Sequence, residues 1–423
     1  MFMGAENQAA EGFRAHQERN LKVLISAFAC QPSRGSEPGV GWNWALQAAR
    51  YHEVWVLTRS SNRAAIDEEL ARKPQANLNF IYHDVPNGAR FLRHGRYGLN
   101  LYYYLWQMTA IPVARKAHAS IVFDLGHHVT YVSFRHPSSL AWLDIPYIWG
   151  PVAGAEDAHW SFFSLYGVNG AIQQALRAVS NKLVALDPFV WYTRNRARIV
   201  LAATPETERK LPHSRVMPAI GIDSNLIPSR PPNICAKPLR LIFVGNLLYL
   251  KGLQLALPAL AIAKAQGAEC SLTIVGDGPF RHRLERMARE LDIEEHVIFR
   301  GNRPLEEVYR LYQEHDIFLF PSLRDSGGFA VLEAMAAGLP VICLDLGGPG
   351  LSVNDETGIR IEAHNPSQVI DGISNAILQF VSSPALVDQM GHAGKHKARN
   401  VHAWDQKGDF LQRIYHELLG AST

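Results

Sequence analysis

The sequence predicts an α/β protein built from two doubly wound domains that face each other across a cleft. The first reason is length, because 423 residues exceed what one ordinary hydrophobic core serves. The second is that apolar runs of strand length alternate with glycine-bearing loops and helix-forming segments in both halves of the chain. The third is a run with four prolines, LIPSRPPNICAKP, which cannot hold regular structure for long and separates the halves.

This division gives a domain map. We expect a loose leader in residues 1–20, a first domain in 21–227, a linker in 228–238, a second domain in 239–400 and a C-terminal helix in 401–423. The leader is polar and lacks the apolar core of a secretory signal. No run approaches the roughly 18 to 20 apolar residues of a membrane-spanning helix.

Composition narrows the class further. Hydrophobic residues make up 47% and charged residues 19%, which is typical of a globular domain in water. The net charge of +3 is too small to indicate nucleic acid as the partner. The four cysteines are far apart in sequence and form no C-x-x-C pair. They favour reduced, buried thiols and a cytoplasmic protein.

In the first domain, strands are expected at 21–29, at 52–59, at 78–85, in a run that ends at Asp124, at 145–149 and at 199–203. Gly39 and Gly41 bracket Val40 in the loop after the first strand, at the carboxyl edge of the predicted sheet. Glu156 follows the 145–149 strand, so this acid is expected near the cleft.

The second domain repeats the alternation, with strands expected at 239–244, 271–275, 296–300, 316–320 and 341–344. Lys251 follows the first of these strands and precedes a helix, so its ammonium can reach phosphate oxygens at the sheet edge. Gly276 and Gly278 form a G-x-G opening, but Arg281 stands where a third glycine would complete a dinucleotide motif.

The most informative stretch runs from residue 316 to 346 and is expected to form strand, loop, helix and strand. Helix formers fill FAVLEAMAA, and Gly338 stops them. The N–H groups of Gly327 and Gly328 open this helix at its positive end, which predicts an anion site. Asp325 and Glu333 flank the site. They suit neutral sugar hydroxyls, or else Asp325 caps the helix and Glu333 is a solvated helix residue.

The spacing from Asp325 to Glu333, with GGF and EAMAxGxPVI around it, resembles the signature of retaining nucleotide-sugar glycosyltransferases of the GT-B fold, family 4. GT-B consists of two Rossmann-like domains, and the resemblance implies that the C-terminal helix crosses back to the first. It also implies that Glu333 binds the ribose, that Gly327 and Gly328 hold the diphosphate and that Asp325 faces the donor sugar. The expected donor-binding set further contains Phe329, Gly245, Asn246, Gly276, Arg300 and Gly301, with the nucleobase near the last two.

Three departures from the family pattern stand out. Asp325 replaces the usual glutamate, and Asn246 replaces the usual arginine, whereas Lys251 matches. Gly150 and Pro151 stand where the family usually has a histidine facing the donor sugar. His127, expected at the end of the neighbouring strand, either approaches the same cleft or is a structural histidine in a hydrogen-bonded turn.

Family members have a glycine-rich loop where Gly39 and Gly41 stand, against the donor phosphates and the acceptor; the alternative is a plain tight turn. A second pair of interpretations concerns residues 90–118, where Arg90, Arg93 and Arg96 flank an apolar, aromatic middle. This segment is either a helix packed in the core or a surface that docks on anionic lipid. Residues 160–200 form a similar aromatic and basic stretch.

The expected activity is transfer of a sugar, with retention, from a UDP- or GDP-linked donor to a glycan or lipid-linked acceptor, with Asp325, Lys251 and His127 as catalytic residues. Neither a cofactor nor a metal site is expected, because no His, Asp and Glu cluster has ligand spacing. We expect no nucleic-acid partner. The location would be cytoplasmic, with a peripheral contact to the inner face of the plasma membrane. A nucleotide-sugar epimerase or phosphorylase, and a non-catalytic nucleotide-sugar-binding protein, are the alternatives.

Overall fold

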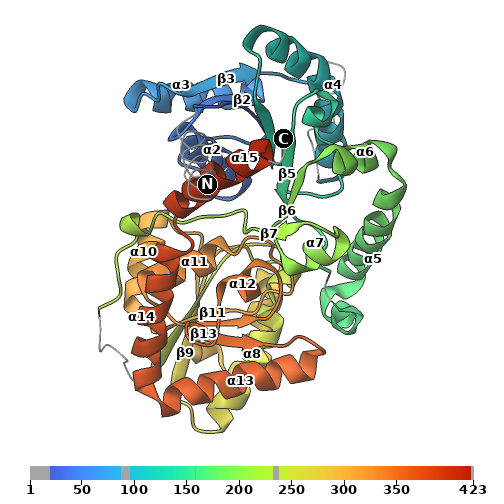
Figure 1. Ribbon diagram of the computed structural model, residues 1–423. Coiled ribbons are helices and arrows are strands. Elements are labelled where there is room, and N and C mark those ends of the chain that lie inside the picture. The colour runs from blue at the N-terminus through green and yellow to red at the C-terminus, as the bar shows by residue number, and fades with distance from the viewer. Residues whose placement is uncertain (1–19, 87–95, 158, 232–237, 421–423) are drawn as a thin grey trace, which may run out of the picture.

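Two parallel β-sheets, each surrounded by helices, form the framework of the molecule and lie one above the other in Figure 1. The computed structural model describes residues 20–86, 96–157, 159–231 and 238–420. The first sheet belongs to the first half of the chain and the second sheet to the second half, so the predicted α/β class is confirmed.

The first sheet has the strand order β3-β2-β1-β4-β5-β6-β7. Its strands are β1 (Lys22–Ala27), β2 (Glu53–Thr58), β3 (Leu78–Tyr82), β4 (Leu125–Thr130), β5 (Tyr147–Val152), β6 (Ile199–Ala202) and β7 (Arg215–Val216). The helices are α2 (Ser36–Ala49), α3 (Arg63–Arg72), α4 (Arg96–Ile121), α5 (Gly167–Leu183), α6 (Pro188–Arg196) and α7 (Pro205–Lys210). The strand order reverses between β1 and β4, where doubly wound sheets bind ligands.

The second sheet repeats this topology in the order β10-β9-β8-β11-β12-β13. Its strands are β8 (Leu239–Val244), β9 (Cys270–Val275), β10 (Val297–Gly301), β11 (Ile317–Phe320), β12 (Val341–Leu344) and β13 (Gly358–Ile361). The helices are α8 (Leu253–Ala265), α9 (Arg281–Glu290), α10 (Leu305–Glu314), α11 (Phe329–Ala337), α12 (Gly347–Ser352), α13 (Pro366–Ser382), α14 (Pro384–Asn400) and α15 (Trp404–Gly420). Its switch point lies between β8 and β11.

The strand–loop–helix–strand unit predicted from residue 316 onward is present. All four residues of β11 and all four of β12 are buried, as expected for parallel strands covered on both faces. Helix α11 begins after Gly328 and ends before Gly338. The φ angle is +74° at Gly328 and +88° at Gly338. Glycine reaches this left-handed region without the Cβ clash of other residues, so the two glycines set the helix bounds.

The two connections between the sheets run side by side. The Ile222 N–H donates to the His402 carbonyl at 2.9 Å, and the Trp404 N–H donates to the Ile222 carbonyl at 3.2 Å. Beyond Trp404, α15 returns to the first domain and packs on α2, as Figure 1 shows. The part of the predicted linker at 232–237 lies outside the described residues. Before it, the buried Arg230 pairs with the buried Asp316 and with the partly exposed Asp388 of the second domain.

One prediction about the first domain is wrong, and another gains support for one of its two interpretations. The strand expected to end at Asp124 is instead β4, which begins at Leu125. The apolar run before Asp124 contains the end of helix α4 at Ile121, and Asp124 accepts a hydrogen bond from the Lys22 N–H. The middle of the segment 90–118 contributes to the core of the first domain, and a contact of this segment with lipid stays a prediction. Its apolar residues Tyr102, Tyr103 and Trp106 are fully buried in the core, which supports the interpretation as a core helix.

The membrane interpretation also depended on the three arginines at the start of that segment. Arg90 and Arg93 lie outside the described residues, and the side chain of Arg96 at the start of α4 does as well. Among the described residues, no helix combines the length and the hydropathy that a bilayer-spanning helix needs.

We expect acid to destabilise the fold between about pH 6.5 and pH 4. Burial lowers the pKa of five histidines: His52 and His127 to about 4, and His128, His136 and His402 to about 3. In this range the unfolded chain binds more protons than the folded one, so stability falls as pH falls. A tenfold difference in proton affinity between the folded and unfolded states corresponds to about 1.4 kcal/mol, so the five groups together give a decrease of several kcal/mol.

Two carboxyls act in the opposite direction. Burial raises the pKa of Glu37 and of Glu333 to about 7, which favours the folded state as pH falls below 7. The pKa changes of the two residue types are of similar size. Two carboxyls therefore offset less than half of the loss of stability that the five histidines cause. Urea unfolding at pH 7, 6, 5 and 4 measures the balance, and His52→Gln should reduce the slope. A free energy of unfolding that stays level or rises toward pH 4 would contradict the expectation.

Candidate functional site

A cavity of about 460 Å³ lies between the two domains. Both switch points contribute to it, because residues that follow β4, β5, β8 and β11 line its wall. The charged and amide residues of the wall are Glu37, Asn100, Arg135, Glu156 and Arg177 from the first domain, and Asn246, Lys251, Arg324 and Asp325 from the second. The cavity therefore combines both signs of charge, with cations in excess.

Lys251 and Asp325 form an ion pair at the centre of the second domain's contribution. Lys251 ends a 3-10 turn (Tyr249–Lys251) that follows β8, and Asp325 lies in the loop after the adjacent strand β11. Gly252 lets these segments meet, because its φ is +75° and a Cβ there would lie 1.8 Å from the Pro321 carbonyl oxygen. As a result, Lys251 Nζ is 2.5 Å from Asp325 Oδ2.

The second oxygen of Asp325 caps helix α11. Oδ1 accepts hydrogen bonds from the N–H groups of Gly327 at 3.0 Å and Gly328 at 2.8 Å. Burial by itself raises the pKa of Asp325, but the Lys251 ammonium and the two N–H donors hold that pKa below its usual value. The predicted anion site exists, but its anion is the Asp325 carboxylate. That the two glycines also hold the diphosphate of the donor stays a prediction.

Glu333 is not the solvated helix residue of the alternative interpretation. The Tyr312 hydroxyl donates to Glu333 Oε2 at 3.3 Å, and burial raises the pKa of this carboxyl to about 7. The residue faces α10 and is not among those that line the cavity. Phe329, at the start of α11, is half-buried against the core. The ribose contact of Glu333 stays a prediction.

Gly245, Gly276 and Gly301 stand side by side at the carboxyl ends of β8, β9 and β10. The Gly245 N–H donates to the Val275 carbonyl at 3.0 Å, and the Gly276 N–H donates to the Gly301 carbonyl at 2.9 Å. A Cβ at Gly276 would lie 2.0 Å from the Gly245 carbonyl oxygen, so close packing of the strand ends requires glycine there. Beside them, Arg300 is exposed and its carbonyl accepts from Arg303 Nε.

The predicted positions of Gly39 and Gly41 are wrong. Both lie inside helix α2 instead of in the loop before it. A Cβ would come within 1.8 Å of the Arg34 carbonyl oxygen at Gly39, and within 2.0 Å of the Ala29 carbonyl oxygen at Gly41. Glycine is therefore needed because the helix touches the backbone of the preceding loop, which is neither of the roles expected from the sequence.

His127 does not reach the cleft, so its assignment as a catalytic residue is wrong. The residue lies in the middle of β4 and is fully buried. Its Nδ1 is 2.8 Å from the Tyr415 hydroxyl on α15, and its Nε2 is 2.7 Å from the Gly150 carbonyl oxygen. With both ring nitrogens bonded and the pKa lowered by burial to about 4, the imidazole is a neutral core group that joins β4, β5 and α15.

The acidic side of the cavity comes from Glu156 and Glu37. Glu156 Oε1 accepts from the hydroxyls of Thr204 at 2.7 Å and Thr207 at 3.1 Å, so this carboxylate is held rigidly. Glu37 was not predicted. It accepts from the Val132 N–H at 3.1 Å, and burial raises its pKa to about 7. Its signal in the sequence was an acid inside the glycine-bearing segment GSEPGVG after the first strand.

Three arginines of the cavity were also missed. Arg324 precedes Asp325 and donates to Gln174 Oε1 at 2.8 Å, which connects the second domain to α5 of the first. Arg177 Nη2 donates to the Gly154 carbonyl at 2.6 Å and Arg135 Nη1 to Asn181 Oδ1 at 2.8 Å. Only the position of Arg324, next to the acidic motif, gave a clue in the sequence. Within the described ranges, no three His, Cys, Asp or Glu side chains are grouped to hold a metal ion.

Comparison with known structures identifies the fold. The apo form of the lipopolysaccharide outer core galactosyltransferase WaaB superposes with a TM-score of 0.64 at 16% identity, over 94% of this chain and all of that one. HepE from Anabaena, in complex with UDP, superposes with a TM-score of 0.62 at 14% identity, again over 94% of this chain and all of HepE. These likenesses confirm the predicted GT-B fold.

Comparison of the sequence with known proteins finds relatives that match part of the chain, and a family model that matches the second domain. A D-inositol 3-phosphate glycosyltransferase of Corynebacterium jeikeium is 32% identical over 184 residues, which are 42% of this chain and 43% of the relative. A GDP-mannose-dependent alpha-(1-6)-phosphatidylinositol monomannoside mannosyltransferase of Mycolicibacterium smegmatis is 30% identical over 181 residues, 41% of this chain and 46% of the relative. The chain thus matches less than half the length of these relatives. Residues 229–397 match the family model of glycosyl transferases group 1, so the second domain of this chain is similar to that family.

Proposed function

We propose that this protein is a retaining glycosyltransferase that moves a sugar from a nucleoside diphosphate to an acceptor bound by the first domain. The observation that carries the proposal is the Lys251–Asp325 pair in the wall of a cleft between two doubly wound domains. HepE, a protein of the same fold, was crystallised with UDP and with UDP-glucose, and the mannosyltransferase relative is GDP-mannose-dependent. A UDP- or GDP-linked sugar is therefore the donor class that we infer.

The reaction breaks the bond between the sugar and the diphosphate, so negative charge grows on the leaving oxygens. Lys251 is a cation of the second domain placed at the strand edge where those oxygens would lie. Preorganised donors of this kind stabilise the transition state more than the ground state and so lower the barrier. Asp325 holds the Lys251 ammonium in position and faces the sugar, as the family resemblance implies.

The first domain would supply the acceptor side. Glu37 lines the same cavity, and a carboxyl with a pKa near 7 can accept or donate a hydrogen bond at neutral pH. We infer that the acceptor is a glycan or a lipid-linked sugar, because the relative from Mycolicibacterium smegmatis is a phosphatidylinositol monomannoside mannosyltransferase.

Thermal unfolding with UDP-, GDP- and ADP-linked sugars tests the donor class. A ligand at 100 times its Kd stabilises the folded state by about 2.7 kcal/mol, so the correct donor should raise the melting temperature visibly. Release of free nucleoside diphosphate should then require an acceptor. Release that needs only inorganic phosphate would favour the phosphorylase, and interconversion of the donor sugar would favour the epimerase. Tight binding with no turnover would favour the non-catalytic protein.

A further inference from the structure

A groove of about 540 Å³ runs between α4 and α5 on the first domain. Leu101 of α4 and Leu176, Val179 and Leu183 of α5 line it, and between 50% and 56% of each of these side chains is exposed. Exposed apolar side chains that gather in one concave place are typical of a binding site, whereas single exposed leucines scattered over a surface are common and need no explanation. The other residues of the groove are Asn100, Tyr104, Arg135, His136, Ser180, Val184 and Asp187. The apolar wall of the groove therefore has the character of a site for an apolar chain.

The exposed apolar surface continues along α5. Val168 and Ile172, at 77% and 52% exposure, continue the spacing of Leu176, Val179 and Leu183 on one helical face. The first two residues do not line the groove, whereas the last three do. Helix α5 therefore carries one set of exposed apolar residues inside the groove and a second set outside it.

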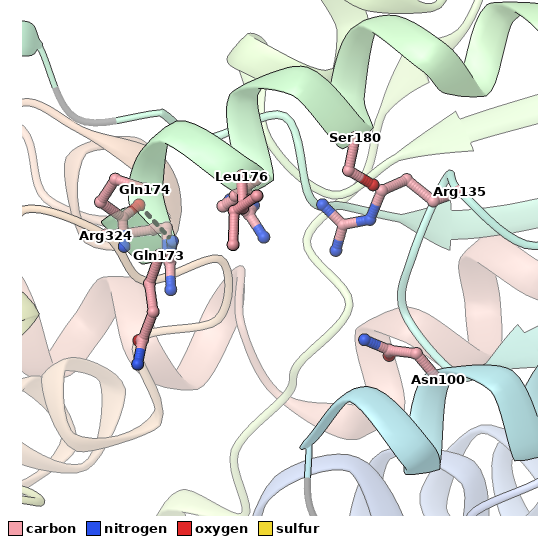
Figure 2. Close-up of a pocket in the computed structure, with 8 residues that line it drawn as sticks. Asn100, Arg135, Gln173, Gln174, Leu176, Ser180 and Arg324 are labelled. Atoms are coloured by element: carbon pink, nitrogen blue, oxygen red, sulfur yellow. Dashed lines mark hydrogen bonds between the residues drawn. The ribbon is translucent and has the colours of Figure 1, made fainter. Parts of the chain in front are cut away.

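The inner end of the groove adjoins a chamber of about 200 Å³ lined by Arg135, Arg177 and Arg324. The other residues of this chamber are Asn100, Gln173, Gln174, Leu176 and Ser180, so its described lining contains no acid. Outside the lining, Arg177 pairs with Asp157 at 3.4 Å and with Glu156 at 3.9 Å. Figure 2 shows Asn100 of α4 and Arg135 opposite Ser180 of α5, with Arg324 hydrogen-bonded to Gln174. A chamber with three guanidinium groups and amide side chains suits a phosphate group.

The cleft, the chamber and the groove form one series. Asn100 and Arg135 line all three, while Arg177 and Arg324 line both the chamber and the cleft that contains Lys251 and Asp325. Along this series the lining changes from a groove with an apolar wall, through a cationic chamber, to the proposed catalytic pair. An amphipathic molecule with an apolar chain, a phosphate and a sugar in that order matches the change.

We propose that the acceptor is a phosphate-linked lipid whose chain occupies the α4–α5 groove and whose phosphate contacts the three arginines, which places the attached sugar in the cleft. The proposal rests on the proposed function, since it names the acceptor of that reaction. The competing hypothesis is that α5 lies flat on a bilayer. In that case the whole apolar face of the helix would contact lipid, and the groove would have no role.

Farnesyl phosphate, used below its micelle concentration and without donor, is a suitable probe, with farnesol and inorganic phosphate as controls. Titration calorimetry should detect farnesyl phosphate binding at least about tenfold tighter than either control, because only the probe engages both apolar wall and arginines. Arg324→Gln should narrow the difference between farnesyl phosphate and farnesol. Equal affinity for farnesol and farnesyl phosphate, or no binding of the probe, would overturn the proposal.

Two matched double variants separate the groove from a bilayer surface. Leu176→Gln with Leu183→Gln should weaken farnesyl phosphate binding about tenfold or more, because each residue lines the groove. Val168→Gln with Ile172→Gln should leave it unchanged. All four residues are exposed, so neither double variant should alter the melting temperature substantially. Equal losses in both double variants would refute the groove. Donor binding is measured separately, so failure here leaves the proposed function standing.

Discussion

Replacing Lys251 with methionine should lower kcat about 100- to 1000-fold, the loss typical when one preorganised donor to a developing oxyanion is removed. Methionine keeps most of the length and the apolar stem of lysine but has no charge. Affinity for the donor should fall less than turnover, because the leaving oxygens gain their charge only in the transition state. Steady-state kinetics with the donor identified by thermal unfolding measures both quantities.

The same substitution leaves Asp325 without its cation, and a loss of stability must be distinguished from a loss of catalysis. About four-fifths of both side chains is buried, so Lys251→Met should cost on the order of 1 to 3 kcal/mol of unfolding free energy. The double variant Lys251→Met with Asp325→Asn should recover most of that stability, because no unpaired charge remains, yet stay as inactive as the single variant. A single variant with wild-type turnover would show that another group stabilises the leaving diphosphate.

Replacing Glu333 with glutamine should weaken donor binding about tenfold or more, since charge-assisted hydrogen bonds to ribose hydroxyls are worth about 1.5 to 3 kcal/mol. The same variant should be more stable than the wild type at alkaline pH. Burial raises the pKa of Glu333 from 4.5 to about 7, so the wild type loses stability as pH rises through 7 and the buried carboxyl ionises. Glutamine cannot ionise, so the variant avoids this loss.

Urea unfolding at pH 5.5 and pH 8.5 measures the second effect. The variant should match the wild type at pH 5.5 and exceed it by about 2 kcal/mol at pH 8.5, which is less than the full change in pKa would give because the side chain is partly exposed. Glu285→Gln is the control. The pKa of Glu285 is lowered by its hydrogen bond to Arg281, so this variant should gain nothing at pH 8.5 and keep donor affinity. Unchanged nucleotide affinity in Glu333→Gln would remove Glu333 from the donor site.

The sequence determined the features that depend on local pattern. The apolar runs that become β8, β11 and β12, and the helix from Phe329 to Ala337, follow from hydrophobic periodicity and glycine stops within a few residues. Parallel strands joined by helices place the loops after them at one edge of the sheet, so Lys251 and Asp325 could be assigned to the same edge from their positions after strands. The family motif supplied the expected roles of these residues.

Tertiary structure alone decided what each polar side chain touches. His127 is a core residue because Gly150 and Tyr415, which lie 23 and 288 residues away in sequence, bond to its two nitrogens. The α11 N–H groups bind Asp325 itself, and Glu37 reaches the cleft through a contact with Val132 on another loop. The apolar residues of α5 are periodic in sequence, but a periodic face is usually buried. Only the tertiary structure left that face exposed and placed α4 across a groove from α5, because burial depends on what the rest of the chain covers.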